Sequence, residues 1–234
     1  MIIELGRDLH KKVQLFKKWA KKTYPNITED NDNGEWCFCK EFDDMFSSAM
    51  ELIQKASASS ADDQMIDDLL YAIARDNECE ILVQETGKLN DWFSLLCRKS
   101  LQSPYTNAKW QFAKELKNHR NNDELKELIF DFLSTGDEYT ERMALESLAV
   151  IEPAQAEKYA VLFWNREKYA EGSYEDEYQK IMALHVLYRV KSACLDKYLR
   201  LAEGSNYHYL KMNAAEIREK MQVSGVVRTF SALR

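Results

Sequence analysis

The chain has 234 residues, of which 45% are apolar and 30% charged, as expected for a soluble protein with a sizeable core. Seven glycines and three prolines are too few for a β fold with many turns and fit helices joined by short loops. The net charge of −7 and the pI near 5.3 argue against a general nucleic-acid binder, whose affinity comes mostly from neutralised phosphates.

Residues 2–22 are predicted to form an amphipathic helix with one apolar face at helical spacing. That face comprises Leu5, Leu9, Val13, Phe16, Trp19 and Ala20. The segment holds seven basic and two acidic residues, a net charge of +5, which leaves −12 for the rest of the chain. The favoured interpretation is a helix that caps one end of the fold and keeps its lysines in water. The alternatives are a helix that lies on an anionic membrane or meets an acidic partner.

Residues 23–35 are polar and rich in turn formers, so a flexible loop is expected there. The run from Glu29 to Gly34 is similar to a calcium-binding loop. With Gly34 at loop position six, Lys40 falls at position twelve, where a bidentate glutamate is required. The sequence therefore predicts no metal site in this loop.

The remaining elements are all predicted to be helices. In residues 1–104, a diverged half, they span 36–56, about 62–75, about 80–85 and 89–102. In the regular half they span 105–119, 123–134, 138–151, 153–166, 174–191, 193–203 and 206–222. Gly136 and Gly204 are placed to end helices, and Pro153 suits a first helical position. The tail 223–234 has no clear period and is expected to be frayed or loosely packed.

A repeated block organises the second half. Residues 137–148 and 176–187 are identical at seven of twelve positions, and both contain Asp-Glu-Tyr followed by Met-Ala-Leu. The offset of 39 continues downstream, where Glu157-Lys158-Tyr159 corresponds to Asp196-Lys197-Tyr198. Repetition at about 40 residues is typical of HEAT or armadillo solenoids. Ala144 and Ala183 are expected to let neighbouring helices approach closely, with the flanking methionines and leucines filling the core.

These residues, together with Ala108–Ala113 and Tyr209–Ala215, resemble a bacterial HEAT-repeat, or armadillo-like, protein over roughly half of the chain. The resemblance implies an all-α superhelix of about five to six helix pairs, one continuous domain over 1–234, with regular repeats over 105–222. It also implies a concave face, lined by the second helix of each pair, that holds a partner. No functional site can be carried over residue by residue, because the family shares none.

The leading functional hypothesis is therefore a non-catalytic protein-binding scaffold. Tyr, Trp and Arg are enriched in interface hot spots. The candidate contact residues are Lys158, Tyr159, Trp164, Asn165, Lys197, Tyr198 and Arg200. An equally weighted interpretation makes Tyr159 and Tyr198 packing residues between repeats. The acidic total favours a partner with a basic surface, and an immunity protein that neutralises a toxin would be one such scaffold.

An enzymatic alternative is given by the HEAT-like alkylpurine DNA glycosylases, which are similar in length and need a basic channel with aromatic residues and an acid. Trp110, Trp164 and Asp196 could take those roles, although the acidic total counts against them. The phosphate-binding and hydrolase motifs sought in the chain are missing, and no His or Cys spacing fits a metal. His185, beside the apolar Met-Ala-Leu run, is expected to be packed or half exposed. No catalytic residue, cofactor or metal is predicted.

The five cysteines include no Cys-x-x-Cys pair, and charged residues interrupt the N-terminal apolar run. No apolar run approaches the ~20 residues that span a bilayer. The sequence therefore predicts a cytoplasmic protein with reduced thiols.

Overall fold

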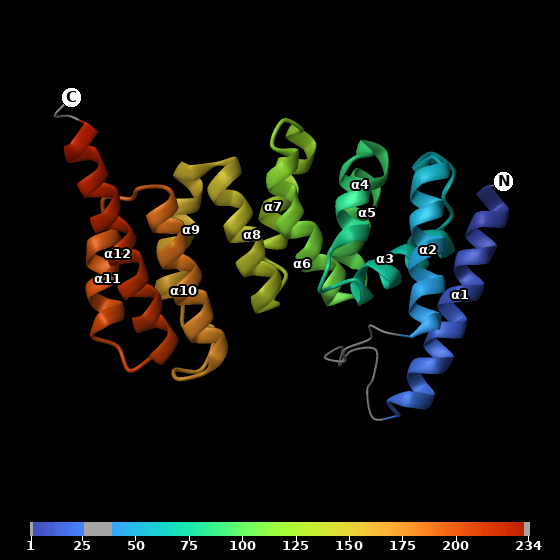
Figure 1. The fold of residues 1–234 in the computed structure, drawn as a ribbon, viewed down its shortest axis with the longest axis horizontal. Helices are drawn as coiled ribbons and strands as arrows, with labels where there is room; N and C mark the ends of the chain where they lie inside the picture. The colour runs from blue at the N-terminus through green and yellow to red at the C-terminus, as the bar shows by residue number, and fades with distance from the viewer. Residues whose placement is uncertain (1, 26–38, 232–234) are drawn as a thin grey trace. The chain divides into compact units, whose positions relative to one another are not determined.

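The structure of the chain is a computed structural model, which describes residues 2–25 and 39–231. All regular structure in these residues is helical, as the sequence predicts, and consists of twelve α-helices and two short 3₁₀ turns (Figure 1). The chain divides into two compact units at Ala144/Leu145, inside helix α8 (Glu138–Ile151). This boundary lies well beyond residue 104, where the repeat pattern of the sequence begins.

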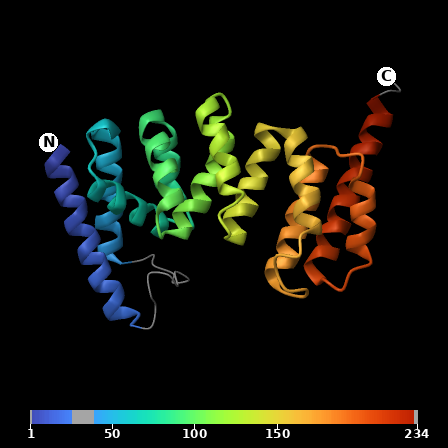
Figure 2. The ribbon, with the colours of Figure 1, turned by 180° about the vertical axis from the view of Figure 1, so that it is seen from behind.

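The first unit contains seven complete helices and the start of α8. They are α1 (Ile2–Thr23), α2 (Lys40–Lys55), α3 (Asp63–Arg75), α4 (Ile81–Gly87), α5 (Asn90–Gln102), α6 (Thr106–Glu115) and α7 (Asp123–Phe132). Helices α1 and α2 run side by side in opposite directions in both ribbon views (Figure 1 and Figure 2). The 3₁₀ turns are Ala58–Ser60 and Leu116–His119.

The apolar face predicted for α1 is confirmed, because Leu9, Val13 and Phe16 are fully buried. The Phe16 ring meets the Tyr71 ring of α3 edge-on, with 6.2 Å between the ring centroids. Polar contacts hold the same helix in place. Ser48 Oγ of α2 donates a hydrogen bond to Asp8 Oδ2 at 2.8 Å, and His10 Nδ1 lies 2.9 Å from Asp68 Oδ2 of α3. Helix α1 therefore covers the core of the first unit, as the capping interpretation predicts.

The second unit contains the end of α8, α9 (Pro153–Asn165), α10 (Tyr174–Arg189), α11 (Leu195–Glu203) and α12 (His208–Ser231). Helix α10 packs against both α9 and α12, and α12 packs against α11. The predicted repeat core is confirmed at Ala183, which is fully buried, and at Leu184 and Leu187, which follow it in the helix. The buried leucines of this unit are Leu145, Leu148, Leu184, Leu187, Leu195, Leu199 and Leu210. Met182 is only half buried.

Local signals at the helix ends agree with the structure at several positions. Pro153 is the first residue of α9, and the Asp62 side chain accepts a hydrogen bond from Met65 N at 2.8 Å at the start of α3. Gly136, predicted to end a helix, has the left-handed φ of +88° that glycine adopts readily, but it lies four residues beyond the last residue of α7. Cys39 stands before α2 as its N-cap, so the helix predicted from residue 36 begins later.

Residues 223–231, expected to be frayed or loosely packed, are not frayed, because α12 continues to Ser231. The physical reason is that this stretch contains no proline and a single glycine, Gly225, which costs a helix only about 1 kcal/mol. The predicted calcium-like loop at 29–34 lies outside the described residues. None of the helices that the structure describes has an apolar stretch long enough to cross a bilayer.

Candidate functional site

The two copies of the repeated block lie at different depths in their helices. Asp137 stands directly before α8, and its Oδ1 accepts a hydrogen bond from Thr140 N at 2.7 Å, as an N-cap does. The corresponding Asp176 is the third residue of α10, whose N-cap is Ser173. The block therefore starts almost one turn further into the helix in the second copy, and the Asp176 carboxylate is available for other contacts.

Asp176 is the centre of a buried polar network. Its Oδ2 accepts hydrogen bonds from Lys180 Nζ and the Tyr207 hydroxyl, and its Oδ1 accepts one from Gln179 Nε2 at 2.8 Å. Burial raises the pKa of Asp176, but the hydrogen bonds from Lys180, Tyr207 and Gln179 outweigh it, and the pKa lies below its usual value. Burial and the bond to the carboxylate raise the pKa of Tyr207. The carboxylate is therefore charged and the phenol protonated at neutral pH.

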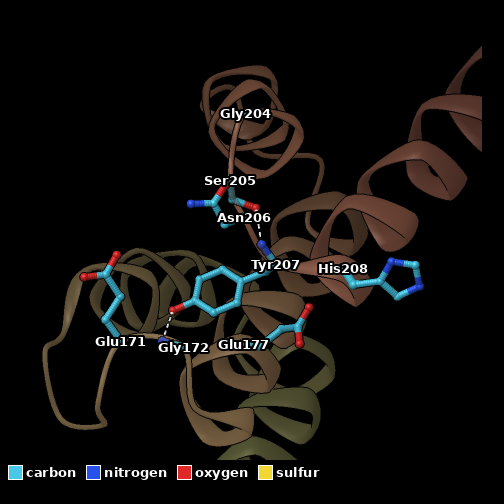
Figure 3. A pocket seen from close by; sticks show the side chains of 8 residues that line it. All are labelled: Glu171, Gly172, Glu177, Gly204, Ser205, Asn206, Tyr207 and His208. Carbon is cyan, nitrogen blue, oxygen red and sulfur yellow. Dashed lines mark hydrogen bonds between the residues drawn. The ribbon is translucent and has the colours of Figure 1, made fainter.

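Tyr207 lines two shallow depressions in the second unit. One, of about 520 Å³, lies between Glu171 and Glu177, and the Tyr207 hydroxyl there accepts a hydrogen bond from Gly172 N at 2.9 Å (Figure 3). The other, of about 600 Å³, adjoins Lys180 and the connection 166–173. Their polar groups bind one another: Glu177 Oε1, for example, accepts a hydrogen bond from Leu210 N at 2.9 Å. These contacts fix the 166–173 connection and the start of α12 to α10, which is a structural role.

The predicted aromatic contact residues Trp164 and Tyr198 are both buried. Their rings meet edge-on with 5.2 Å between centroids, and Tyr198 is only 3% exposed. Asn165 Nδ2 donates a hydrogen bond to Val161 O at 2.7 Å and lies 3.5 Å from the Tyr198 hydroxyl oxygen. For Tyr198 the burial favours the packing interpretation. Tyr159 is half buried.

Arg200 is exposed but already engaged. It forms an ion pair with Asp196 at 2.7 Å, and Asp196 also binds Arg218 of α12 at 2.6 Å. Hydrogen bonding to Arg218, together with the nearby charges of Arg200 and Arg218, lowers the pKa of Asp196. Arg218 binds Glu203 as well, at 2.8 Å, so this network ties α12 to α11. The remaining predicted cations, Lys158 and Lys197, are exposed.

Two leucines that the sequence analysis did not select lie beside these lysines. Leu162 of α9 is 55% exposed and Leu201 of α11 is 48% exposed. Each follows its lysine by four residues, so lysine and leucine share one side of their helix. The two leucines are 39 residues apart, the offset of the repeat, and this recurrence is the sequence signal that could have revealed them. Lys158, Leu162, Lys197 and Leu201 are called the lysine–leucine face below.

Helices α9 and α11 carry this face as neighbours, because the Trp164–Tyr198 ring contact joins them directly. A second contact lies toward their N-terminal ends, where Ser192 Oγ donates a hydrogen bond to Glu157 Oε1 at 2.5 Å. The buried aromatic pair thus has a definite effect on the surface. It holds together two helices that each carry an exposed lysine and an exposed leucine at equivalent positions of the repeat.

The residues considered for enzymatic roles have other contacts. Trp110, in the first unit, is buried, and its ring lies 5.0 Å from that of Tyr139. Asp196 is held by two arginines, as described above. His185 is half exposed, as predicted, and its Nε2 lies 2.7 Å from Asn213 Oδ1. In the part of the chain that the structure describes, no three His, Cys, Asp or Glu side chains are grouped so that they could hold a metal ion.

No family model matches the chain, and neither the curated proteins nor the solved structures include a significant match. The resemblance to HEAT-repeat proteins therefore depends on the repeated residues themselves.

Proposed function

We propose that this chain is an α-solenoid of the HEAT kind, a single domain that binds another protein through the second helices of its repeats. The observation that carries the proposal is the pair of exposed leucines, Leu162 and Leu201, at equivalent positions of the repeat. Fully burying a leucine contributes roughly 1.5–3 kcal/mol, and since each of these is about half exposed, the two together can contribute a similar amount to holding a partner. A single exposed leucine is ordinary, but one repeated at the same site on neighbouring helices supports an interface.

The charges beside the leucines favour acidic groups on the partner at this face. Lys158 and Lys197 flank the leucines, while Arg200 is paired with Asp196. The basic partner predicted from the total charge of −7 would have to meet the chain elsewhere. We therefore assign this face a partner with an apolar patch bordered by carboxylates. The packing beneath the face, with Tyr198 locked against Trp164, supports binding with little rearrangement.

Site-specific photo-crosslinking in the native host tests the proposal. A photoreactive amino acid replaces Leu162 or Leu201, and in a matched control it replaces Met212, an apolar residue of α12 that is exposed to a similar extent. We expect one and the same protein to be crosslinked from positions 162 and 201 and not from 212.

Crosslinking of that protein equally from all three positions would contradict the assignment to the lysine–leucine face. Recovery of nucleic acid instead of protein would replace the scaffold proposal with the glycosylase-like alternative. A partner whose crosslinked segment is basic would keep the scaffold and overturn the proposed charge of its contact surface.

A further inference from the structure

A second, independent surface lies in the first unit between α1 and α2. A depression of about 330 Å³, mostly apolar in its lining, is formed there by Leu15 and Trp19 of α1, with Lys18, Lys22 and Lys40 among the residues around them. Leu15 is 46% exposed. The volume of the depression is at the lower limit of roughly 300–1,000 Å³ for small-molecule sites. It therefore fits one bulky side chain better than a whole ligand.

Aromatic contacts make the floor of this depression rigid. The Trp19 ring stacks on the buried Phe16 ring at 5.6 Å between centroids, and it meets Tyr24 edge-on at 5.9 Å. A side chain that entered the depression would therefore pack on an indole that is already held in place. Tryptophan in such a setting is a frequent interface hot spot, because little conformational entropy is lost on binding.

The charges around the depression are of two kinds. On α2, Lys40 and Asp44 are bonded to each other, so their charges offset one another, and Glu41 adds one negative charge to the lining. Lys18 and Lys22 lie one turn apart on α1 and take part in none of the ion pairs found among residues 2–25 and 39–231. They give the α1 side of the depression two positive charges, which outweigh Glu41 on the α2 side and can meet carboxylates.

We propose that the α1–α2 depression binds an acidic segment of a partner protein, with one bulky apolar side chain seated on Trp19 and carboxylates beside it at Lys18 and Lys22. Two observations favour a protein segment over a membrane surface. The main apolar face of α1 is buried in the core of the first unit and cannot enter lipid. The apolar surface around Trp19 is a hollow, which receives a projecting side chain, whereas membrane insertion needs side chains that project from the protein. Ile3 of α1 is exposed as well, but it lies about three turns from Leu15.

Fluorescence anisotropy with short labelled peptides tests this inference. The probes are three peptides in which Asp and Glu flank a central Leu, Phe or Trp, and control peptides have Ala at the centre or Lys in the flanks. We expect at least one acidic peptide to bind the full-length protein saturably and to weaken about tenfold or more when its central residue is Ala. Raising the salt concentration to about 0.5 M should also weaken the binding of the acidic peptide, because salt screens its attraction to the lysines.

Variants locate the binding. Lys18→Glu/Lys22→Glu should weaken the best peptide at least about tenfold more than Lys11→Glu/Lys21→Glu, which changes the same charge on α1 outside the depression. Leu15→Glu, at an exposed position, should also abolish binding without unfolding the protein. If both double lysine variants lost the same amount of affinity for the peptide, the attraction would be to the charge of α1 as a whole. This result would overturn the proposed site.

Two further outcomes would also overturn it. One is that none of the three acidic peptides binds up to about 1 mM. The other is binding to vesicles of phosphatidylserine and phosphatidylcholine in place of peptide, with loss in Leu15→Glu, which would assign the surface to a membrane. Neither outcome affects the lysine–leucine face, because the two sites lie in different units and their variants are separate.

Discussion

The pH dependence of stability should contain a contribution from Asp76 that one substitution removes. This carboxyl group lies at the end of α3, is 4% exposed and accepts a hydrogen bond from Leu82 N of α4 at 2.7 Å. Burial raises the pKa of Asp76 to about 6, although the bonds from Leu82 and Ile81 act in the opposite direction. The Asp76→Asn substitution keeps the shape and an acceptor oxygen but removes the titration.

The sign and size of the effect follow from linkage. Because the pKa is higher in the folded protein than in the unfolded chain, the folded protein holds the proton more tightly, and this stabilisation is lost as the pH rises through about 6. The shift of about two pKa units corresponds to about 3 kcal/mol in total, of which about 1.3 kcal/mol is lost between about pH 5 and pH 7. Between about pH 5 and pH 7, the free energy of unfolding of Asp76→Asn should therefore rise by about 1.3 kcal/mol relative to that of wild type.

Urea unfolding followed by circular dichroism, at several pH values from about 5 to 7, measures this difference. Asp123→Asn is the matched control. Its carboxyl group is exposed, and the hydrogen bond from Lys126 lowers its pKa, so it titrates below this range. For Asp123→Asn, the difference in free energy of unfolding from wild type should stay constant with pH. A constant difference for Asp76→Asn as well would refute the account of Asp76 as a buried group of raised pKa.

Three other predictions concern the architecture. Glu177→Ala should lower the free energy of unfolding by about 1–3 kcal/mol, because a buried backbone N–H of α12 loses its acceptor; urea unfolding should show Glu177→Gln retaining most of that stability. Iodoacetamide should label Cys79 in the native protein and Cys97 only after unfolding. The reason is that Cys79 is exposed, whereas burial shields the Cys97 thiol and raises its pKa. Equal rates of labelling of the two cysteines in the native protein, measured by mass spectrometry, would contradict this. Gly172→Ala should cost about 1–2 kcal/mol, since Gly172 has φ +88°, whereas Gly204→Ala, at an ordinary φ, should be close to neutral in the same urea assay.

Most helices could be predicted from the sequence because their apolar period and end signals act locally. The α1 face built on Phe16 and the start of α9 at Pro153 are examples, and neither depends on distant residues. The continuation of α12 to Ser231 could not be predicted in this way, because residues 223–231 lack a clear apolar period. A helix can continue through such a stretch when no proline interrupts it, but the sequence then gives no positive signal of where the helix ends.

The candidate site was harder to predict for a physical reason. Sequence identity placed Asp137 and Asp176 in equivalent positions, but an earlier N-cap, Ser173, shifts the second copy by almost a turn and changes its contacts. The residue type of Tyr198 likewise left a contact role and a packing role equally weighted, and only its burial distinguishes them. Which side of a helix its neighbours leave open is a property of packing, so the 39-residue offset could mark Leu162 and Leu201 as equivalent, but their exposure had to come from the structure.

The most direct test of the proposed function is the affinity between the purified chain and the protein crosslinked from position 162 or 201, measured by isothermal titration calorimetry. Leu162→Ser/Leu201→Ser should weaken binding by about tenfold or more, since burying the exposed half of both leucines contributes roughly 1.5–3 kcal/mol in total. Met212→Ser, which removes an exposed apolar side chain from α12, should leave the affinity unchanged. Equal affinities for wild type and the double leucine variant would contradict the claim that the lysine–leucine face is the binding surface.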